Sequence, residues 1–178
     1  MENKSKFSNL LFDIACSAMA CDYDIDEREE REIIYISNST TYFEGIDISE
    51  NIEKFKEKFN ENPEETIADS IRKLKTIELD FVKELLVLEI VLRIIYADTK
   101  IDPHEIEFVK KIRGMMTVSD NIIKERFGKI DFLFNQEFII SEKDGIVKEK
   151  LSPNEMLNIE NMYLGIDKKS SSNKGPNN

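Results

Sequence analysis

The chain has 178 residues, of which 36 are Asp or Glu and 25 are Lys or Arg, so its formal net charge is −11. This length suits one domain with its own hydrophobic core. The charge argues against direct binding to nucleic acid or anionic lipid, because both would repel the chain. It leaves cations or a basic protein surface as the expected partners.

Four helices are predicted in the first half of the chain. Apolar residues recur at helical spacing between residues 6 and 21. A second helix is expected from Glu27 to about Ile36. The stretch ISENIEKFKEKFN, residues 48–60, alternates apolar and charged residues and predicts an amphipathic surface helix. Pro63 suits the first turn of a fourth helix.

The most apolar stretch runs from about Ile77 to Ala97. Charged residues interrupt it, and no charge-free run approaches the roughly 20 residues that a membrane span requires. We therefore predict a central buried helix and no transmembrane segment. Glu89 and Arg93 lie four residues apart, and we expect them to pair on the more exposed side of this helix.

Further helices are expected from Pro103 to about Met115 and over SDNIIKERF, residues 119–127, where Ser119 or Asp120 is a natural N-cap. The pattern weakens after Asp131. The segment near 137–150 is predicted to be either a β-hairpin around EKDG or an ordered irregular segment, because Asp-Gly favours tight turns. A last helix is expected over 154–164.

The fold class is therefore all-α, a single compact bundle of about seven or eight helices. One domain is predicted over residues 1–165, with repeat cores at 5–36 and 78–115. The tail, residues 168–178, has no apolar residue and is expected to be disordered.

One pattern, D-x-x-I-D-x-x-E, occurs twice. It reads CDYDIDERE over residues 21–29 and ADTKIDPHE over residues 97–105. In each copy an apolar helix precedes the pattern, and another helix with apolar residues in phase follows it. Two copies in the same context predict a duplicated helix–turn–helix hairpin with pseudo-twofold packing.

Helix capping explains part of this pattern. Asp102 is a good N-cap, Pro103 suits the first helical position, and Glu105 stands where a capping box places its acid. Asp26 and Glu29 take the same positions in the first copy. Capping does not explain the first aspartate of each copy, which follows a helix C-terminus, where the helix dipole disfavours negative charge. Such a local conflict is typical of functional sites.

Metal binding is the functional interpretation of that conflict. Carboxylates gathered around a turn are the ligands that Ca²⁺ and Mg²⁺ prefer. The first copy begins like an EF-hand loop, but Glu27 stands where glycine is needed and Ile33 where the bidentate glutamate should be. The candidate ligands of this first site are Asp22, Asp24, Asp26 and Glu29.

A second and weaker candidate site has Lys100 in place of one acid of the first. Its ligands would be Asp98, Asp102 and Glu105. One acid in each preceding helix, Asp13 or Glu89, is either a supporting acid or simply exposed on the outer face. Plain helix capping without a metal remains the alternative for both copies.

At these residues the sequence resembles the TerB-like family, the tellurite-resistance helical domain. That family carries two motifs close to A-D-G-x-I-D-x-x-E, each at a helix–helix junction. The resemblance covers roughly residues 5–130. The chain departs from the family pattern at the glycine, which is Tyr23 in the first copy and Thr99 in the second.

The resemblance implies a compact helical domain with acidic patches and a role for a divalent cation. It implies a part in bacterial stress or defence systems, with tellurite and phage resistance as the associated phenotypes. It also implies protein partners in a multi-protein assembly, some close to the membrane, and no enzyme activity.

The remaining chemistry-bearing residues point to no reaction. Cys16 and Cys21 lie on an apolar helix and are expected to pack in the core, and their small number favours a reducing compartment. With no apolar run long enough for a signal peptide, a cytoplasmic location is expected. His104, the only histidine, is expected to be exposed at a helix start.

Three functions remain open at the level of the sequence. The first is a non-enzymatic acidic interaction module, with or without a bound cation. The second is a metal-free adaptor whose acidic turns are only caps and whose 131–150 segment docks a partner. The third, a metal-dependent hydrolase using the acids of the first copy, lacks a candidate base and an enclosed pocket.

Overall fold

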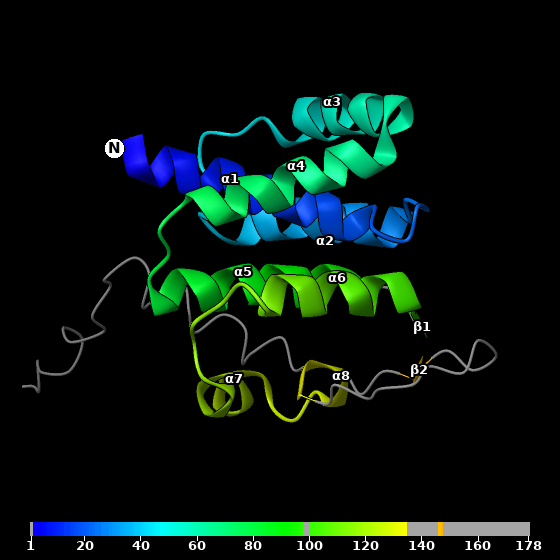
Figure 1. The fold of residues 1–178 in the computed structure, drawn as a ribbon. Helices are drawn as coiled ribbons and strands as arrows, with labels where there is room; N and C mark the ends of the chain where they lie inside the picture. The colour runs from blue at the N-terminus through cyan, green and yellow to red at the C-terminus, as the bar shows by residue number, and fades with distance from the viewer. Residues whose placement is uncertain (1, 98–99, 135–145, 148–178) are drawn as a thin grey trace, which may run out of the picture.

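A computed structural model describes residues 2–97, 100–134 and 146–147 (Figure 1). Its elements, in chain order, are α1 (Glu2–Met19), α2 (Glu27–Ser39), α3 (Ile48–Glu61), α4 (Pro63–Thr76), α5 (Phe81–Ile95), β1 (Lys100–Ile101), α6 (Pro103–Arg113), α7 (Asp120–Phe127), α8 (Asp131–Phe134) and β2 (Ile146–Val147). The predicted all-α class and the number of helices are confirmed for this part of the chain.

Helix α5 forms the centre of the bundle. Every residue from Glu84 to Ile95 is buried, so apolar residues occur on all sides of this helix, and Glu84, Glu89 and Arg93 are buried among them. Helix α1 packs along α5, and α2 and α6 also contact it. Helix α4 packs against α1, and α3 packs against α4. Helices α7 and α8 lie on the side of α5 and α6 that faces away from α1 (Figure 1).

Side-chain caps fix where these helices begin. The N-cap side chain accepts a hydrogen bond from a backbone amide in the first turn of α2, α3, α4, α5, α6 and α7. Such a cap contributes about 1 kcal/mol to the stability of its helix. The capping residues are Asp26, Asp47, Asn62, Asp80, Asp102 and Ser119.

The central helix begins later than predicted. It starts at Phe81, four residues after the expected Ile77, because Asp80 takes an extended conformation and accepts a hydrogen bond from the amide of Lys83. Residues 77–79 form a connector whose apolar side chains are partly buried against the core. Helix α8 was not expected, since it is only four residues long and begins at Asp131 itself.

The predicted Glu89–Arg93 pair is wrong. Glu89 is 0% exposed, so the expectation that it faces solvent is wrong as well. Its carboxylate pairs with Arg126 of α7 at 3.0 Å. Arg93 instead pairs with Glu32 of α2 at 2.7 Å, and its guanidinium lies over the Tyr35 ring. Both faces of α5 are covered, so each charge needs a partner from another helix.

Several predictions concern residues outside the described part. These are the helix at 154–164, the tail at 168–178 and nearly all of the hairpin near 137–150. Within that segment, β2 is described, and it pairs antiparallel with β1: Lys100 lies opposite Val147 and Ile101 opposite Ile146. Across the residues searched, no helix is long and apolar enough to cross a membrane.

Candidate functional site

The two acidic motifs occupy two helix junctions. The first joins α1 to α2 and the second joins α5 to α6, as the sequence predicts. Because α1 packs along α5, both junctions lie at the same end of the bundle, on the right of Figure 1. The Tyr23 ring of the first turn contacts the His104 ring that follows the second, with 6.1 Å between ring centres. The pseudo-twofold relation itself stays a prediction.

The first turn is tight and left-handed at its apex. Tyr23 has a backbone φ of 69°, which residues other than glycine rarely adopt and which glycine adopts freely. The amide of Tyr23 donates to the Ala20 carbonyl at 3.1 Å, and the amide of Asp24 donates to Oδ1 of Asp22 at 3.0 Å. The tyrosine therefore takes a left-handed conformation at the position where the motif of the similar family has glycine.

Asp22 carries the conflict that its position predicts. Partial burial raises the pKa of its carboxyl group, and the nearby Asp102 charge raises that pKa further, while the hydrogen bond from the Asp24 amide opposes both effects. Asp102 belongs to the other turn. The two motifs thus bring like charges together at one end of the protein.

Asp26 has a different environment. Its Oδ1 accepts from the amide of Arg28 at 2.7 Å and from Nε of Arg28 at 2.9 Å, and its Oδ2 accepts from Nη2 at 2.7 Å. The side-chain bonds from Arg28, followed by its amide, lower the pKa of Asp26 to about 2. Both carboxylate oxygens are therefore engaged within α2 itself.

The second turn confirms the capping interpretation. Oδ1 of Asp102 accepts from the His104 amide at 2.8 Å, and Oε2 of Glu105 accepts from the Asp102 amide, which completes a capping box. Nδ1 of His104, an exposed side chain as expected, lies 2.7 Å from the same Asp102 oxygen. Asp98 lies outside the described residues.

Cys21 marks the point where the two motifs meet. Its thiol is buried, as is that of Cys16, so the core-packing interpretation of both is confirmed. Burial raises the pKa of Cys21, and the carboxylates of Glu105, Asp22 and Glu29 raise it further. Glu29 and Glu105, one from each motif, are themselves buried. The thiol remains protonated at neutral pH, which makes it a packing group and not a nucleophile.

Basic side chains engage several carboxylates of the candidate cation sites. Arg28 forms an ion pair with Asp26. The two supporting acids are also paired with basic side chains: Asp13 with Lys73 at 2.8 Å, and Glu89 with Arg126. Within the described residues no group of three or more His, Cys, Asp or Glu side chains is arranged to hold a metal.

A groove that the sequence analysis missed lies beside the first turn, between α4 and α6. Its volume is about 240 Å³. Each helix lines it with residues at i, i+3, i+4 and i+7, a spacing that puts them on one face. That spacing was the available signal, but only the packing shows that the two faces meet. The lining residues are Glu64, Ile67, Ala68 and Ile71 of α4, His104, Glu107, Phe108 and Lys111 of α6, and Cys21 and Tyr23 of the turn.

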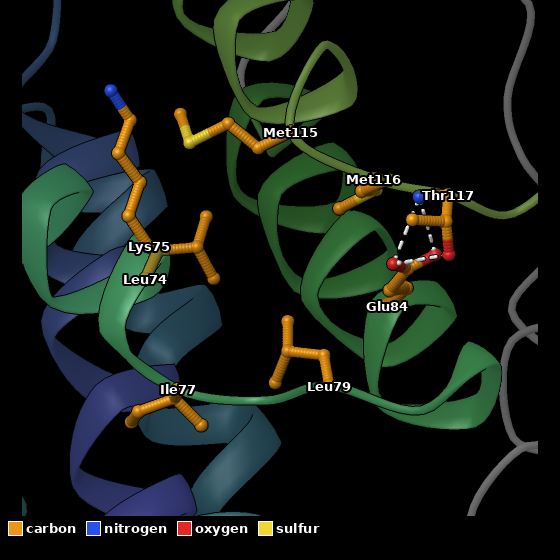
Figure 2. A pocket seen from close by; sticks show the side chains of 8 residues that line it. All are labelled: Leu74, Lys75, Ile77, Leu79, Glu84, Met115, Met116 and Thr117. Atoms are coloured by element: carbon orange, nitrogen blue, oxygen red, sulfur yellow. Dashed lines mark hydrogen bonds between the residues drawn. The ribbon is translucent and has the colours of Figure 1, made fainter.

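A larger hollow, of about 400 Å³, lies where α5 begins, away from the two turns (Figure 2). Its walls are mostly apolar, from Leu74 to Met116, with Lys75 at its edge. Glu84 is its buried acid. The Glu84 carboxylate accepts from the amide and hydroxyl of Thr117 at 2.9 Å and from the amide of Val118 at 2.6 Å. Glu84 therefore anchors the linker between α6 and α7, and both of its carboxylate oxygens accept hydrogen bonds from that linker.

Comparison with models of protein families finds a match. The family model described as tellurite resistance protein TerB matches residues 11–125, which is more than half of the chain and includes both acidic turns. No curated protein and no solved structure matches the chain.

Proposed function

The chain belongs to the TerB family, and from this premise we propose that it is a non-enzymatic, acidic interaction module of a bacterial tellurite-resistance system. Its working surface is the end of the bundle where the two turns meet. One observation carries the proposal: the Tyr23 and His104 rings, 6.1 Å apart, bring the two turns together, so the charge of Asp102 lies near enough to Asp22 to raise the pKa of its carboxyl group.

Maintaining like charges in proximity costs stability, and neither Asp22 nor Asp24 is needed to cap a helix. A basic partner surface would relieve this repulsion on binding. The proposed partners are therefore proteins with a basic surface. A cytoplasmic assembly near the membrane is the setting that membership of the family suggests. The proposal that the chain is not an enzyme rests on its family.

Growth on tellurite tests the proposed function. Deletion of the gene in its own host should increase sensitivity to tellurite, and a plasmid carrying the full chain should restore resistance. Equal growth of the deletion strain and its parent would contradict the proposal. Plating of phage on the same two strains tests phage defence, which is the alternative setting for the same module.

Divalent-cation binding at the first turn is the second candidate. The repulsion between Asp22 and Asp102 favours it, because a cation would offset both charges. The Arg28–Asp26 pair opposes it, since the guanidinium holds both oxygens of one candidate ligand. This candidate therefore requires Arg28 to leave Asp26.

Thermal melts in EDTA, calcium and magnesium test this second candidate. A ligand that binds only the folded state at a hundredfold excess over Kd adds about 2.7 kcal/mol to the free energy of unfolding. A rise of several degrees with calcium, abolished by Asp22→Ala and enlarged by Arg28→Ala, would support a cation site. No shift in the wild type or in Arg28→Ala would reject it and leave the metal-free module.

A further inference from the structure

We propose that the groove between α4 and α6 receives an arginine side chain of the basic protein partner. The inference rests on the proposed function and gives its surface a specific docking point. The groove adjoins both turns, because Tyr23 and Cys21 come from the first and His104 follows the second.

The groove has an apolar floor and a polar rim. Cys21, Ile71 and Phe108 are buried and form the floor. Glu64 of α4 and Glu107 of α6 are exposed, and both line the groove. An apolar floor with a carboxylate on each of the two lining helices suits a side chain with a hydrocarbon stem and a cationic head, which is the composition of arginine.

The size of the groove selects the kind of occupant. Small-molecule and cofactor sites usually measure roughly 300–1,000 Å³. The groove, at about 240 Å³, is below that range. A single long side chain fits this volume, whereas a cofactor or a whole helix does not.

Tyr23 supplies an aromatic wall. Tyr23 is 52% exposed, although its ring contacts the rings of Phe59 and His104. The left-handed backbone conformation of Tyr23 is strained, whereas the same conformation in glycine is not. Such strained residues cluster at functional sites. A guanidinium stacks favourably on a ring of this kind.

The charge around the groove also favours a cation. Lys111 is on the rim, but Glu64 and Glu107 outnumber it, and Asp22 and Asp102 lie beside the same end. The helix N-termini at that end are already capped, α4 by Asn62 and α6 by Asp102. An anionic group would therefore meet repulsion and find no free helix terminus.

An NMR titration of the full ¹⁵N-labelled chain tests the inference. The probe is N-acetyl-arginine amide, and N-acetyl-citrulline amide is its neutral isostere. We expect the arginine probe to shift the amides of Tyr23, Ala68 and Phe108, and the citrulline probe to leave them in place. Glu107→Gln and Tyr23→Ala should each weaken binding about threefold, the loss expected for one exposed charge or cation–π contact. Glu125→Gln on α7 is the matched control and should leave the affinity unchanged.

Three outcomes would overturn the groove as the docking point. They are equal binding of the two probes, shifts confined to other acidic surfaces, and equal loss of affinity in Glu107→Gln and Glu125→Gln. None of these would remove the proposed function, because the tellurite growth test is independent of the probe.

Discussion

At Tyr23 the backbone takes a left-handed conformation with φ of 69°, and the amide still closes the turn onto Ala20. Because a bulky residue stands at the glycine position of the motif, the sequence did not predict whether this turn would keep a left-handed backbone conformation. In the structure the turn takes the left-handed shape, and the tyrosine ring packs against the rings of Phe59 and His104.

Two substitutions at Tyr23 test this geometry. Both Tyr23→Gly and Tyr23→Ala remove the ring, so they differ only in what the backbone tolerates. Alanine in a left-handed conformation is strained, whereas glycine is not. We expect the glycine variant to have the larger free energy of unfolding, by about 1 kcal/mol. Urea denaturation at a constant m-value measures this difference, and an equal or greater stability of the alanine variant would contradict the turn geometry.

Asp22 makes stability depend on pH in a direction set by its raised pKa. The folded state binds this proton more tightly than the unfolded chain, in which an aspartate titrates near about 3.9. Ionised Asp22 therefore lowers the free energy of unfolding above the folded-state pKa. This loss of stability is absent at a pH below the pKa that the Asp22 carboxyl group has in the unfolded chain.

We accordingly expect Asp22→Asn to raise the free energy of unfolding at pH 7 by less than about 1 kcal/mol, since the side chain is only half buried. Asparagine keeps the acceptor for the Asp24 amide. The gain should disappear as the pH falls below about 3.9. Denaturant melts at several pH values measure it, with Asp24→Asn as control, and a gain that persists at low pH would exclude charge as its cause.

At the scale of single elements, local sequence signals predicted where helices begin, but they did not predict which charged side chains pair between helices. The start of α6 follows from Asp102, Pro103 and Glu105, which act within one turn, so the sequence alone predicts the capping box that the structure contains. The partners of Glu89 and Arg93 come from α7 and α2 and depend on which helices pack together. Spacing along one helix carries no such information.

The Glu89–Arg126 pair links α7 to the central helix. The Glu89 side chain is 1% exposed and that of Arg126 is 15% exposed, so removal of one partner leaves a buried charge. We expect Arg126→Met to lower the free energy of unfolding by about 3 kcal/mol, and the double variant with Glu89→Leu to recover most of that loss. A double-mutant cycle by urea denaturation measures both. A single variant as stable as the wild type would show that the pair does not hold α7.

At the scale of the whole molecule, the packing of α1 along α5 joins two motifs that are far apart in the sequence. The duplicated pattern predicted that each motif lies at a helix junction. It did not predict that Asp22 and Asp102 interact, or that α4 and α6 enclose a groove beside them. Both features depend on the relative placement of helices, which a one-dimensional pattern does not encode.

That placement makes one end of the bundle distinct, and we expect function to depend on this end and not on net charge alone. Two triple variants separate these possibilities, because each removes three negative charges. The first neutralises the turns and retains asparagine as a good cap at residue 102. The second neutralises exposed glutamates on α3 and α7. The variants are Asp22→Asn, Asp24→Asn and Asp102→Asn for the turns, and Glu53→Gln, Glu57→Gln and Glu125→Gln for the control.

The decisive experiment is growth of the deletion strain on tellurite when it carries each variant, with thermal melts to verify that both fold. We predict that the control variant restores resistance as the wild-type chain does and that the turn variant fails to restore it. Full resistance with the folded turn variant would contradict the claim that the meeting point of the two acidic turns is the working surface of this protein.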